Sequence, residues 1–287
     1  ALFNYLHAKH HGGVYKLRIE DTDQQRSTSE AVQVILDGLT WLGVEQDEAP
    51  VYQSERIAAH KAAAEKLLAE GKAYKCTATP EELQAMREEQ QKAGKKPMYD
   101  QRHRNGENIK EGAPYTVRLK TPNEGETSWD DAVQGRISYA NTEIDDFIIL
   151  RSDGTPTYNL VVAVDDADMG VTDVIRGDDH INNTPKQILI YQALGLTLPE
   201  FSHLPLIHGD DGKKLSKRHG AVSVTQFRDE GYLPEAVRNY LLQLGWSYGE
   251  DMIDLQTAVE KFDIHDVNRG AANFNTQKLD WFNSRYM

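Results

Sequence analysis

The sequence predicts an α/β fold whose open sheet is interrupted by an α+β insertion and followed by a helical region. Strand-like and helical segments alternate early in the chain, with strand periodicity at 14–19 and helical periodicity at 27–42 and 54–70. Charged residues follow strand-like segments at 20–23 and 176–180, which is where an open α/β sheet places its ligand crevice. Between 73 and 160 the pattern changes to short strands and one charged helix, which indicates an insertion.

Length and composition exclude several classes of protein. The chain has 287 residues, enough for about two domains with a sizeable core. Its net charge of −13 excludes a broadly positive surface that binds nucleic acid, so RNA would have to bind local basic patches. No apolar run approaches the roughly 20 residues of a membrane span. The single cysteine, Cys76, fits a reducing cytoplasm, and a removed targeting peptide is left open.

The first segment ends in a cluster of carboxylates. An amphipathic helix ends at Gly12–Gly13, and the alternating strand 14–19 leads into Glu20, Asp21 and Asp23. These carboxylates are either ligand-binding groups at a strand end or turn and cap residues. The next helix begins with the capping-box spacing of Ser27 and Glu30.

The insertion carries the densest basic cluster outside the loop near 213–219. A charged helix is predicted from Thr79 to about Ala93, and short strands at 115–119 and 146–151. The cluster either contacts an RNA backbone or is a solvated helix end. Its members are Lys92, Lys95, Lys96, Arg102, His103 and Arg104.

A second strand end lies at 176–180. The strand-like segment 171–176 runs into Arg176-Gly177-Asp178-Asp179-His180, and a helix is predicted from Ile181 to Leu194. Arg176 is either a ligand-binding group or a structural partner of Asp178 or Asp179. Mg²⁺ held mainly by substrate phosphates is favoured over a protein cage.

The stretch from Asp210 to Gly220 follows an apolar run at 204–207 and contains the Asp-Gly turn signal. It crowds four cations onto one loop, which indicates either a polyanionic ligand such as a triphosphate or a solvated hairpin tip. Helices are then expected at 224–230, from Pro234 to Gly245, and over 276–286. The cations are Lys213, Lys214, Lys217 and Arg218.

Four spaced motifs, in order, resemble those of the bacterial glutamyl-tRNA synthetases. They are Leu17–Asp23, Thr157–Asn159, Val174–Pro185 and Asp211–Arg218. The resemblance covers essentially all 287 residues. The second class I signature, usually quoted as KMSKS, reads KLSKR here, with Leu215 for the methionine and Arg218 for the final serine.

The resemblance implies a Rossmann-type catalytic domain in two halves, 1–72 and 161–221, the second carrying the KLSKR loop. An acceptor-stem-binding insertion at 73–160 splits the halves, and a helical stem-contact domain follows at 222–287. It also implies that the first class I signature, HIGH, lies upstream of Ala1 and that an anticodon-binding domain follows Met287. On that expectation the chain alone has little activity.

The implied activity is glutamate–tRNA ligation with ATP and Mg²⁺, on tRNA(Glu), by a cytoplasmic monomer. By the same resemblance Glu20 receives the substrate ammonium, Arg176 pairs with the side-chain carboxylate, and Tyr158 lines the pocket. Lys214 and Lys217 stabilise charge on the reacting phosphate. The implied ATP-binding residues are Asp179, His180, Leu206, Ile207, Ser216 and Lys217. The candidate tRNA contacts come from the basic cluster of the insertion and are Lys95, Lys96, Arg102 and Arg104.

One departure concerns zinc, which some bacterial members bind through a Cys-x-Cys pair and a later Cys-x-His pair. Here the corresponding segments read Cys76-Thr77-Ala78 and His103-Arg104-Asn105. Cys76 and His103 fall short of the four ligands of a structural zinc site, so no zinc is expected.

Two alternatives to the full synthetase remain. One is the truncated paralogue that glutamylates a modified tRNA nucleoside, against which the long insertion and the helical segment after Val224 argue. The other is a non-catalytic tRNA-binding or assembly module, against which Glu20, Arg176 and Lys217 argue.

Overall fold

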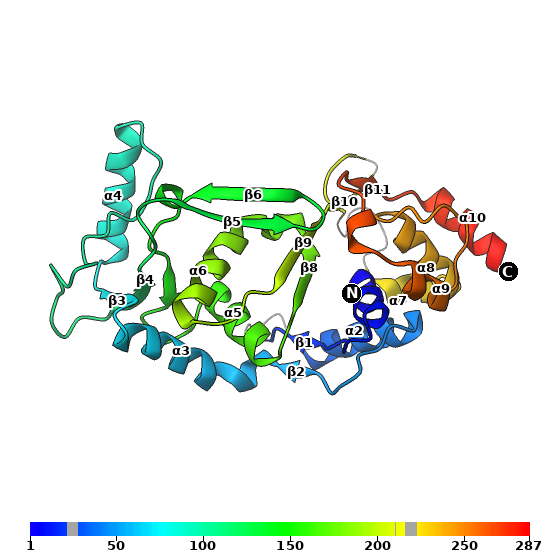
Figure 1. The fold of residues 1–287 in the computed structure, drawn as a ribbon, viewed down its shortest axis with the longest axis horizontal. Coiled ribbons are helices and arrows are strands. Elements are labelled where there is room, and N and C mark those ends of the chain that lie inside the picture. The colour runs from blue at the N-terminus through cyan, green and yellow to red at the C-terminus, as the bar shows by residue number, and fades with distance from the viewer. Residues whose placement is uncertain (22–27, 210, 216–222) are drawn as a thin grey trace.

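The computed structural model describes residues 1–21, 28–209, 211–215 and 223–287. Figure 1 shows an elongated molecule, with the charged helix of the insertion at one end and the C-terminal helices at the other. Several predicted residues lie outside the described part, namely Asp23, Ser27, Asp210, Ser216, Lys217 and Arg218. In the part of the chain that is described, no helix is long and apolar enough to cross a membrane.

The first segment contains a short parallel strand pair. Its elements are α1 (Leu2–His10), β1 (Arg18–Ile19), α2 (Ser29–Leu42), β2 (Val51–Tyr52), η1 (Gln53–Arg56) and α3 (Ile57–Ala69). β1 pairs with β2, with Arg18 opposite Val51. The predicted strand 14–19 is wrong for its first part, because Tyr15 hydrogen bonds through both its N–H and its carbonyl to Asp47 instead.

The cap of helix α2 also differs from the prediction. The side chain that accepts from the first turn belongs to Thr28, whose Oγ1 receives the N–H of Ala31 at 3.2 Å. The helix therefore begins one residue later than the capping-box spacing indicated. It ends as predicted at Gly43, whose positive φ of 70° suits glycine at a helix C-terminus.

The insertion is α+β, as predicted, and contains more strands than the sequence indicated. Its elements are β3 (Ala73–Cys76), α4 (Pro80–Lys92), β4 (Thr116–Leu119), β5 (Glu126–Asp131), β6 (Gly135–Ala140), η2 (Asn141–Glu143) and β7 (Ile148–Leu150). β3, β4 and β7 form an antiparallel sheet, while β5 and β6 form a separate hairpin. The hairpin, which the sequence analysis missed, packs on β9 of the following segment (Figure 1).

The second α/β segment is a strand–helix–strand unit. Its elements are α5 (Tyr158–Asp168), β8 (Asp173–Gly177), η3 (Asp178–Asn183), α6 (Thr184–Leu194), β9 (Glu200–Leu204) and β10 (Ile207–His208). β8 and β9 are parallel, with Arg176 opposite His203. The domain boundary predicted at 160 falls inside α5, which packs on α6 and α3.

The C-terminal region is helical, as predicted. It contains α7 (Val224–Asp229), α8 (Pro234–Gln243), α9 (Leu255–Lys261), η5 (Ile264–Asp266), β11 (Ala272–Asn273) and α10 (Thr276–Tyr286). The last helix has the bounds that its periodicity predicted. Helix α1, although first in the sequence, packs here, because Leu6 is buried in one core with Trp246 and Phe262 (Figure 1).

The largest core joins the insertion to the α/β segments. Leu119 and Ile149 from the insertion strands are buried with Ala64 of α3, Leu160 of α5 and Ile190 of α6. Burial of this apolar surface is the main force that holds the insertion strands against α3, α5 and α6. Helix α5 also carries carboxylates of the site described next.

Candidate active site

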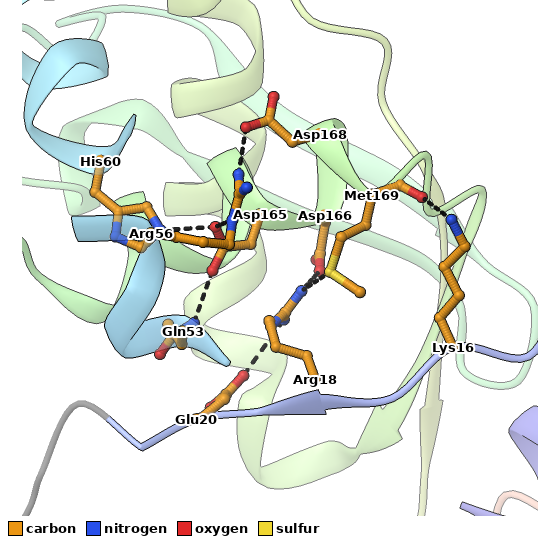
Figure 2. A network of polar contacts seen from close by, with 10 residues as sticks. All are labelled: Lys16, Arg18, Glu20, Gln53, Arg56, His60, Asp165, Asp166, Asp168 and Met169. Carbon is orange, nitrogen blue, oxygen red and sulfur yellow. Dashed lines mark hydrogen bonds and ion pairs between the residues drawn. The ribbon is translucent and has the colours of Figure 1, made fainter. Parts of the chain in front are cut away.

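Arg18 and Glu20 leave β1 on the side where α5 presents carboxylates (Figure 2). Arg18 Nη1 donates to Asp166 Oδ1 at 2.6 Å, and Nη2 lies 3.3 Å from Glu20 Oε1. Arg18 and Asp166 are largely buried, whereas Glu20 is about half exposed. Burial lowers the pKa of Arg18, but the charge and hydrogen bond of Asp166, together with the charges of Glu20 and Asp165, outweigh it and the net pKa is raised. Glu20 is thus held from one side and open to a ligand on the other.

The neighbouring carboxylate, Asp165, fastens α5 to η1 and α3 (Figure 2). It accepts from Gln53 Nε2 at 3.0 Å and from Arg56 Nε at 2.6 Å, and His60 Nε2 lies 2.6 Å away. Burial raises the pKa of Asp165, and these hydrogen bonds outweigh it and lower the pKa overall. Asp165 is therefore a framework group, and the adjacent Asp166 faces Arg18.

Arg176, at the end of β8, is held by neutral acceptors. Its Nε donates to His203 Nε2 at 3.2 Å and its Nη2 to Thr184 Oγ1 at 2.8 Å. Among the described residues no carboxylate forms an ion pair with Arg176, so the predicted structural alternative, a pair with Asp178 or Asp179, is wrong. Burial lowers the pKa of Arg176, and the neighbouring Tyr158, Asp166, Tyr191 and Asp131 offset this effect only partly. The guanidinium is a partly buried cation without a contacting anion among the described residues.

Tyr158 connects the Glu20 and Arg176 sides. It begins α5, and its hydroxyl lies 3.2 Å from His180 Nδ1. Burial raises the pKa of Tyr158, the charge of Arg176 lowers it, and the charge of Glu20 raises it. The charges of Glu20 and Arg176 thus both reach the Tyr158 phenol, and a shared glutamate pocket of these three residues stays a prediction. Their ligand roles remain predictions.

The second cluster of predicted residues surrounds the start of the KLSKR loop. Lys214 Nζ lies 2.7 Å from Asp179 Oδ2, and this contact is the first cause of the lowered pKa of Asp179. A Cβ on Gly177 would lie 2.6 Å from Asp179 Oδ1 and 3.4 Å from Leu206 Cδ2, so the close approach requires glycine. Ile207 accepts the N–H of Leu215 at 2.9 Å. Asp179, Leu206, Ile207 and Lys214 are therefore brought together.

The predicted turn before Lys214 is confirmed. Gly212 has a φ of 71°, in the left-handed region that glycine adopts readily, and Lys213 donates its N–H to Asp211 Oδ1 at 3.0 Å. Gly209 in turn donates to the Lys213 carbonyl at 2.8 Å. The turn places Lys214 beside Asp179, while Ser216 and Lys217 lie outside the described residues.

Asp21 has the cap role that was one of its two interpretations. Its carboxylate accepts the N–H of Ser54 at 2.8 Å and the Ser54 hydroxyl at 2.6 Å. Because Ser54 lies in the first turn of η1, Asp21 ties the end of β1 to the helix that follows β2. Glu20 is therefore the described carboxylate of this cluster that faces the candidate site.

The basic cluster of the insertion is divided by internal pairing. Arg104 Nη1 lies 2.6 Å from the buried Asp146 and its Nη2 donates to the Thr121 carbonyl, so this guanidinium is structural. Arg102 is bound to Asp100, and Lys96 Nζ lies 2.6 Å from Glu143 Oε2. Lys95 and Lys96 are exposed at the end of α4. A tRNA contact by the two lysines stays a prediction.

Cys76 and His103 lie in a hydrogen-bond chain with Tyr99. Cys76 Sγ is 3.2 Å from the Tyr99 hydroxyl, which is 3.1 Å from His103 Nδ1, and His103 Nε2 is 3.1 Å from the Asn108 carbonyl. Burial lowers the pKa of His103. Within the described ranges no group of three His, Cys, Asp or Glu could hold a metal. These residues do not fit a structural zinc site, and zinc content remains to be measured.

Residues distant in sequence complete the site and were missed by sequence reasoning. Asp166 contacts Arg18, His203 contacts the predicted Arg176, and the Tyr191 hydroxyl is buried with no hydrogen-bond partner among the described atoms. Burial raises the pKa of Tyr191, and the charges of Asp166 and Arg176 act on it as well. In the sequence, these residues are marked only by lying on elements next to a strand end. This feature does not distinguish them from their neighbours.

The parallel strands and the polar residues at their carboxyl ends define an α/β ligand-binding domain of Rossmann type. The family described as tRNA synthetases class I (E and Q), catalytic domain, matches residues 1–281. The chain belongs to this family.

The named relatives of this chain are glutamate–tRNA ligases. A glutamate–tRNA ligase of Geobacter sulfurreducens is 55% identical over 288 residues, covering 100% of this chain and 62% of the relative. One from Azoarcus sp. is 55% identical over 293 residues, covering 63% of its length. The crystal structure of a glutamate tRNA ligase from Elizabethkingia meningosepticum in complex with its amino acid superposes with a TM-score of 0.89 at 34% identity, over 99% of this chain and 65% of that one. The chain thus spans less than two thirds of these relatives.

Proposed function

We propose that the full-length protein containing this chain is a glutamate–tRNA ligase that activates L-glutamate with ATP and transfers glutamyl to the 3′-terminal adenosine of tRNA(Glu). Membership in the class I (E and Q) family supports this proposal, as do the glutamate–tRNA ligases that match the whole chain. We also propose a cytoplasmic monomer, on the resemblance alone.

The observation that carries the proposal is the state of Arg176. Its guanidinium is partly buried, is oriented by two neutral acceptors and has no contacting carboxylate among the described residues. An uncompensated cation at the carboxyl end of a strand suits an anionic ligand. A guanidinium offers only donors, so it fits both oxygens of the glutamate side chain and meets the NH₂ of glutamine unfavourably.

The other end of the amino acid suits the Glu20 side of the pocket. Glu20 is partly exposed while Arg18 steadies one of its oxygens, which leaves the carboxylate able to receive the substrate ammonium. Tyr158 has a partly exposed ring, and its hydroxyl lies beside His180. Glu20 as an anion and Arg176 as a cation complement the ammonium and the side-chain carboxylate of glutamate.

Activation requires no enzyme nucleophile. The glutamate α-carboxylate attacks the α-phosphorus of ATP, the bond to the β-phosphate oxygen breaks, and pyrophosphate leaves, so the site must position the reactants and stabilise charge. Lys214 lies at the predicted ATP side, paired with Asp179 until an anion replaces that partner. Lys217 and Ser216 keep the phosphate roles that the resemblance implies, and Leu206 and Ile207 keep their place beside adenine.

Mg²⁺ is proposed to arrive with the phosphates. Mg²⁺ usually keeps several waters and binds through substrate phosphates with one or two carboxylates, which supports a cation coordinated mainly by ATP. Asp179, which contacts Lys214, is a carboxylate on the predicted phosphate side. When bound, the ion neutralises charge on the leaving pyrophosphate.

ATP–pyrophosphate exchange on the full-length protein tests the proposal. Glutamate and glutamine are each offered with and without tRNA. Exchange with glutamate only in the presence of tRNA supports the synthetase. Glutamate exchange without any tRNA indicates the truncated paralogue, and no exchange under any condition indicates a non-catalytic tRNA-binding module.

A further inference from the structure

A chain of polar groups runs from Arg176 into the insertion. Arg176 on β8 donates from Nε to His203 Nε2 on β9 at 3.2 Å. The other ring nitrogen, Nδ1, lies 2.5 Å from Asp131 Oδ2 at the end of β5. The side chains of His203 and Asp131 are fully buried, so water does not compete for these contacts. Two parallel strands and the insertion hairpin therefore meet at one imidazole.

The partners of His203 determine its tautomer. A guanidinium can only donate, so Nε2 of His203 must accept, and the ring proton must sit on Nδ1 facing Asp131. Asp131 also accepts the N–H groups of His203 at 3.0 Å, Val133 at 3.1 Å and Gln134 at 3.0 Å, and Trp129 Nε1 at 3.2 Å. A carboxylate surrounded by donors stays ionised and keeps the imidazole proton on Nδ1.

The pKa of Asp131 agrees with this arrangement. Burial raises the pKa of its carboxyl, but the hydrogen bonds from His203 and Gln134 outweigh burial and bring it to about 2. Gln134, in the turn of the same hairpin, also donates from Nε2 to the His203 carbonyl at 2.9 Å. The hairpin thus fixes both the ring and the backbone of His203.

We infer that His203 is a positioning residue for Arg176, with Asp131 of the insertion hairpin setting the tautomer that makes this possible. The inference rests on the proposed function, in which Arg176 binds the side-chain carboxylate of glutamate. A neutral acceptor at Nε2 aims the guanidinium and leaves its charge for the substrate. The Thr184 hydroxyl is likewise a neutral acceptor and holds Nη2 of Arg176. The remaining nitrogen, Nη1, donates to no described residue.

A carboxylate in place of His203 would hold the guanidinium as firmly and neutralise it. The imidazole instead supplies direction without charge, and the negative charge of Asp131 is kept one ring further away. The geometry of the amino-acid pocket therefore depends on a residue of the insertion, 72 positions before His203 in the sequence.

Two substitutions of His203 by an amide residue each keep one of its two contacts, so the contacts can be tested separately. His203→Gln can place its carbonyl oxygen near the Nε2 position and keep an acceptor for Arg176. His203→Asn can keep a donor toward Asp131 but does not reach Arg176. In tRNA-dependent ATP–pyrophosphate exchange by the full-length protein, we expect His203→Asn to raise the glutamate KM about tenfold, the loss of one charge-assisted hydrogen bond. His203→Gln should stay within about threefold of wild type, and the ATP KM should stay unchanged in both.

Asp131→Asn tests the same contact between Arg176 and His203 by changing the partner of His203 Nδ1. It replaces His203→Asn if that variant does not fold. An amide NH₂ facing Nδ1 favours the tautomer with its proton on Nε2, where it opposes the N–H of Arg176. The glutamate KM should again rise while the ATP KM does not. Thermal unfolding of each variant identifies losses that come from stability.

Arg176→Gln distinguishes failure of this inference from failure of the proposed function. If Arg176→Gln leaves the glutamate KM unchanged, the pocket itself is wrong and the inference falls with it. If Arg176→Gln raises the glutamate KM but His203→Asn and His203→Gln behave alike, or the ATP KM rises equally, only the role of His203 is overturned. The double variant His203→Asn with Arg176→Gln should be no worse than Arg176→Gln alone.

Discussion

Arg18 and Arg176 are two arginines of one site with opposite surroundings. Both act on the buried carboxylate of Asp166, but only Arg18 contacts it, at 2.6 Å. Arg18 contacts carboxylates and its pKa is raised, whereas Arg176 contacts a histidine and a threonine and its pKa is lowered. The comparison indicates that an arginine paired within the protein supports the framework, while one held by neutral groups is available to an anion.

The largest expected effect is on stability, at Arg18. Arg18→Met leaves the buried Asp166 without its cation, which should lower the free energy of unfolding by about 3–5 kcal/mol. Urea unfolding of the full-length protein measures this loss of unfolding free energy. Adding Asp166→Leu to Arg18→Met should recover most of the loss, because no unpaired charge then remains. A loss below about 1 kcal/mol in Arg18→Met would remove the framework role.

The next largest effect is expected on the free energy of unfolding at acidic pH, through the titration of Asp131. Its folded pKa of about 2 lies below the ordinary value of 3.8, so its contribution is complete above about pH 5. That contribution is lost as the pH falls through 3.8 toward 2. The gap in unfolding free energy between wild type and Asp131→Asn should therefore narrow by about 2 kcal/mol between pH 5 and pH 2. A constant gap over this range would mean that Asp131 titrates normally.

A smaller effect on stability is expected at Arg176, in direct contrast to Arg18. Arg176→Met removes a buried cation that has no contacting carboxylate among the described residues, and the Thr184 hydroxyl can then donate to His203 Nε2, 3.1 Å away. The free energy of unfolding should change by no more than about 1 kcal/mol. Arg18→Met, measured in the same urea series, is the matched control. Equal losses at the two arginines would contradict the comparison.

The smallest effect on stability is expected at the exposed pair of Lys214 and Asp179. Lys214→Ala should change the unfolding free energy by about 0.5 kcal/mol or less, because both groups are solvated. The rate of ATP–pyrophosphate exchange should nevertheless fall at least about tenfold, since the lysine is proposed to stabilise charge on the phosphate. Asp179→Asn, which frees the same lysine, is the control for loss of the pair itself. An unchanged exchange rate in Lys214→Ala would remove Lys214 from the reaction.

The sequence predicted those features that depend on neighbouring residues. The α/β pattern, the bounds of α10, the Asp-Gly turn and the position of Arg176 at a strand end all follow from local periodicity and turn chemistry. The contacts that give the side chains their roles join distant positions, such as Arg18 and Asp166, which are 148 residues apart. No spacing rule indicates such pairs, so neither the pairing of Arg104 with Asp146 nor the support of Arg176 by His203 could be predicted.

The cap role of Asp21 shows the same limit. Sequence alone offered both a ligand role and a cap role for this residue, because aspartate suits either. Its contact with Ser54, 33 residues later, decides in favour of the cap. Glu20, one position earlier on the other side of the chain, keeps the exposed carboxylate.

The most direct test of the central claim is the ratio of kcat/KM for glutamate over glutamine in tRNA-dependent ATP–pyrophosphate exchange, in wild type and in Arg176→Gln. If the uncompensated guanidinium selects the side-chain carboxylate, the ratio should fall by roughly 100-fold in the variant, about 3 kcal/mol, with the KM for ATP unchanged. A ratio that stays the same in Arg176→Gln would contradict the claim and assign the choice of amino acid to other residues.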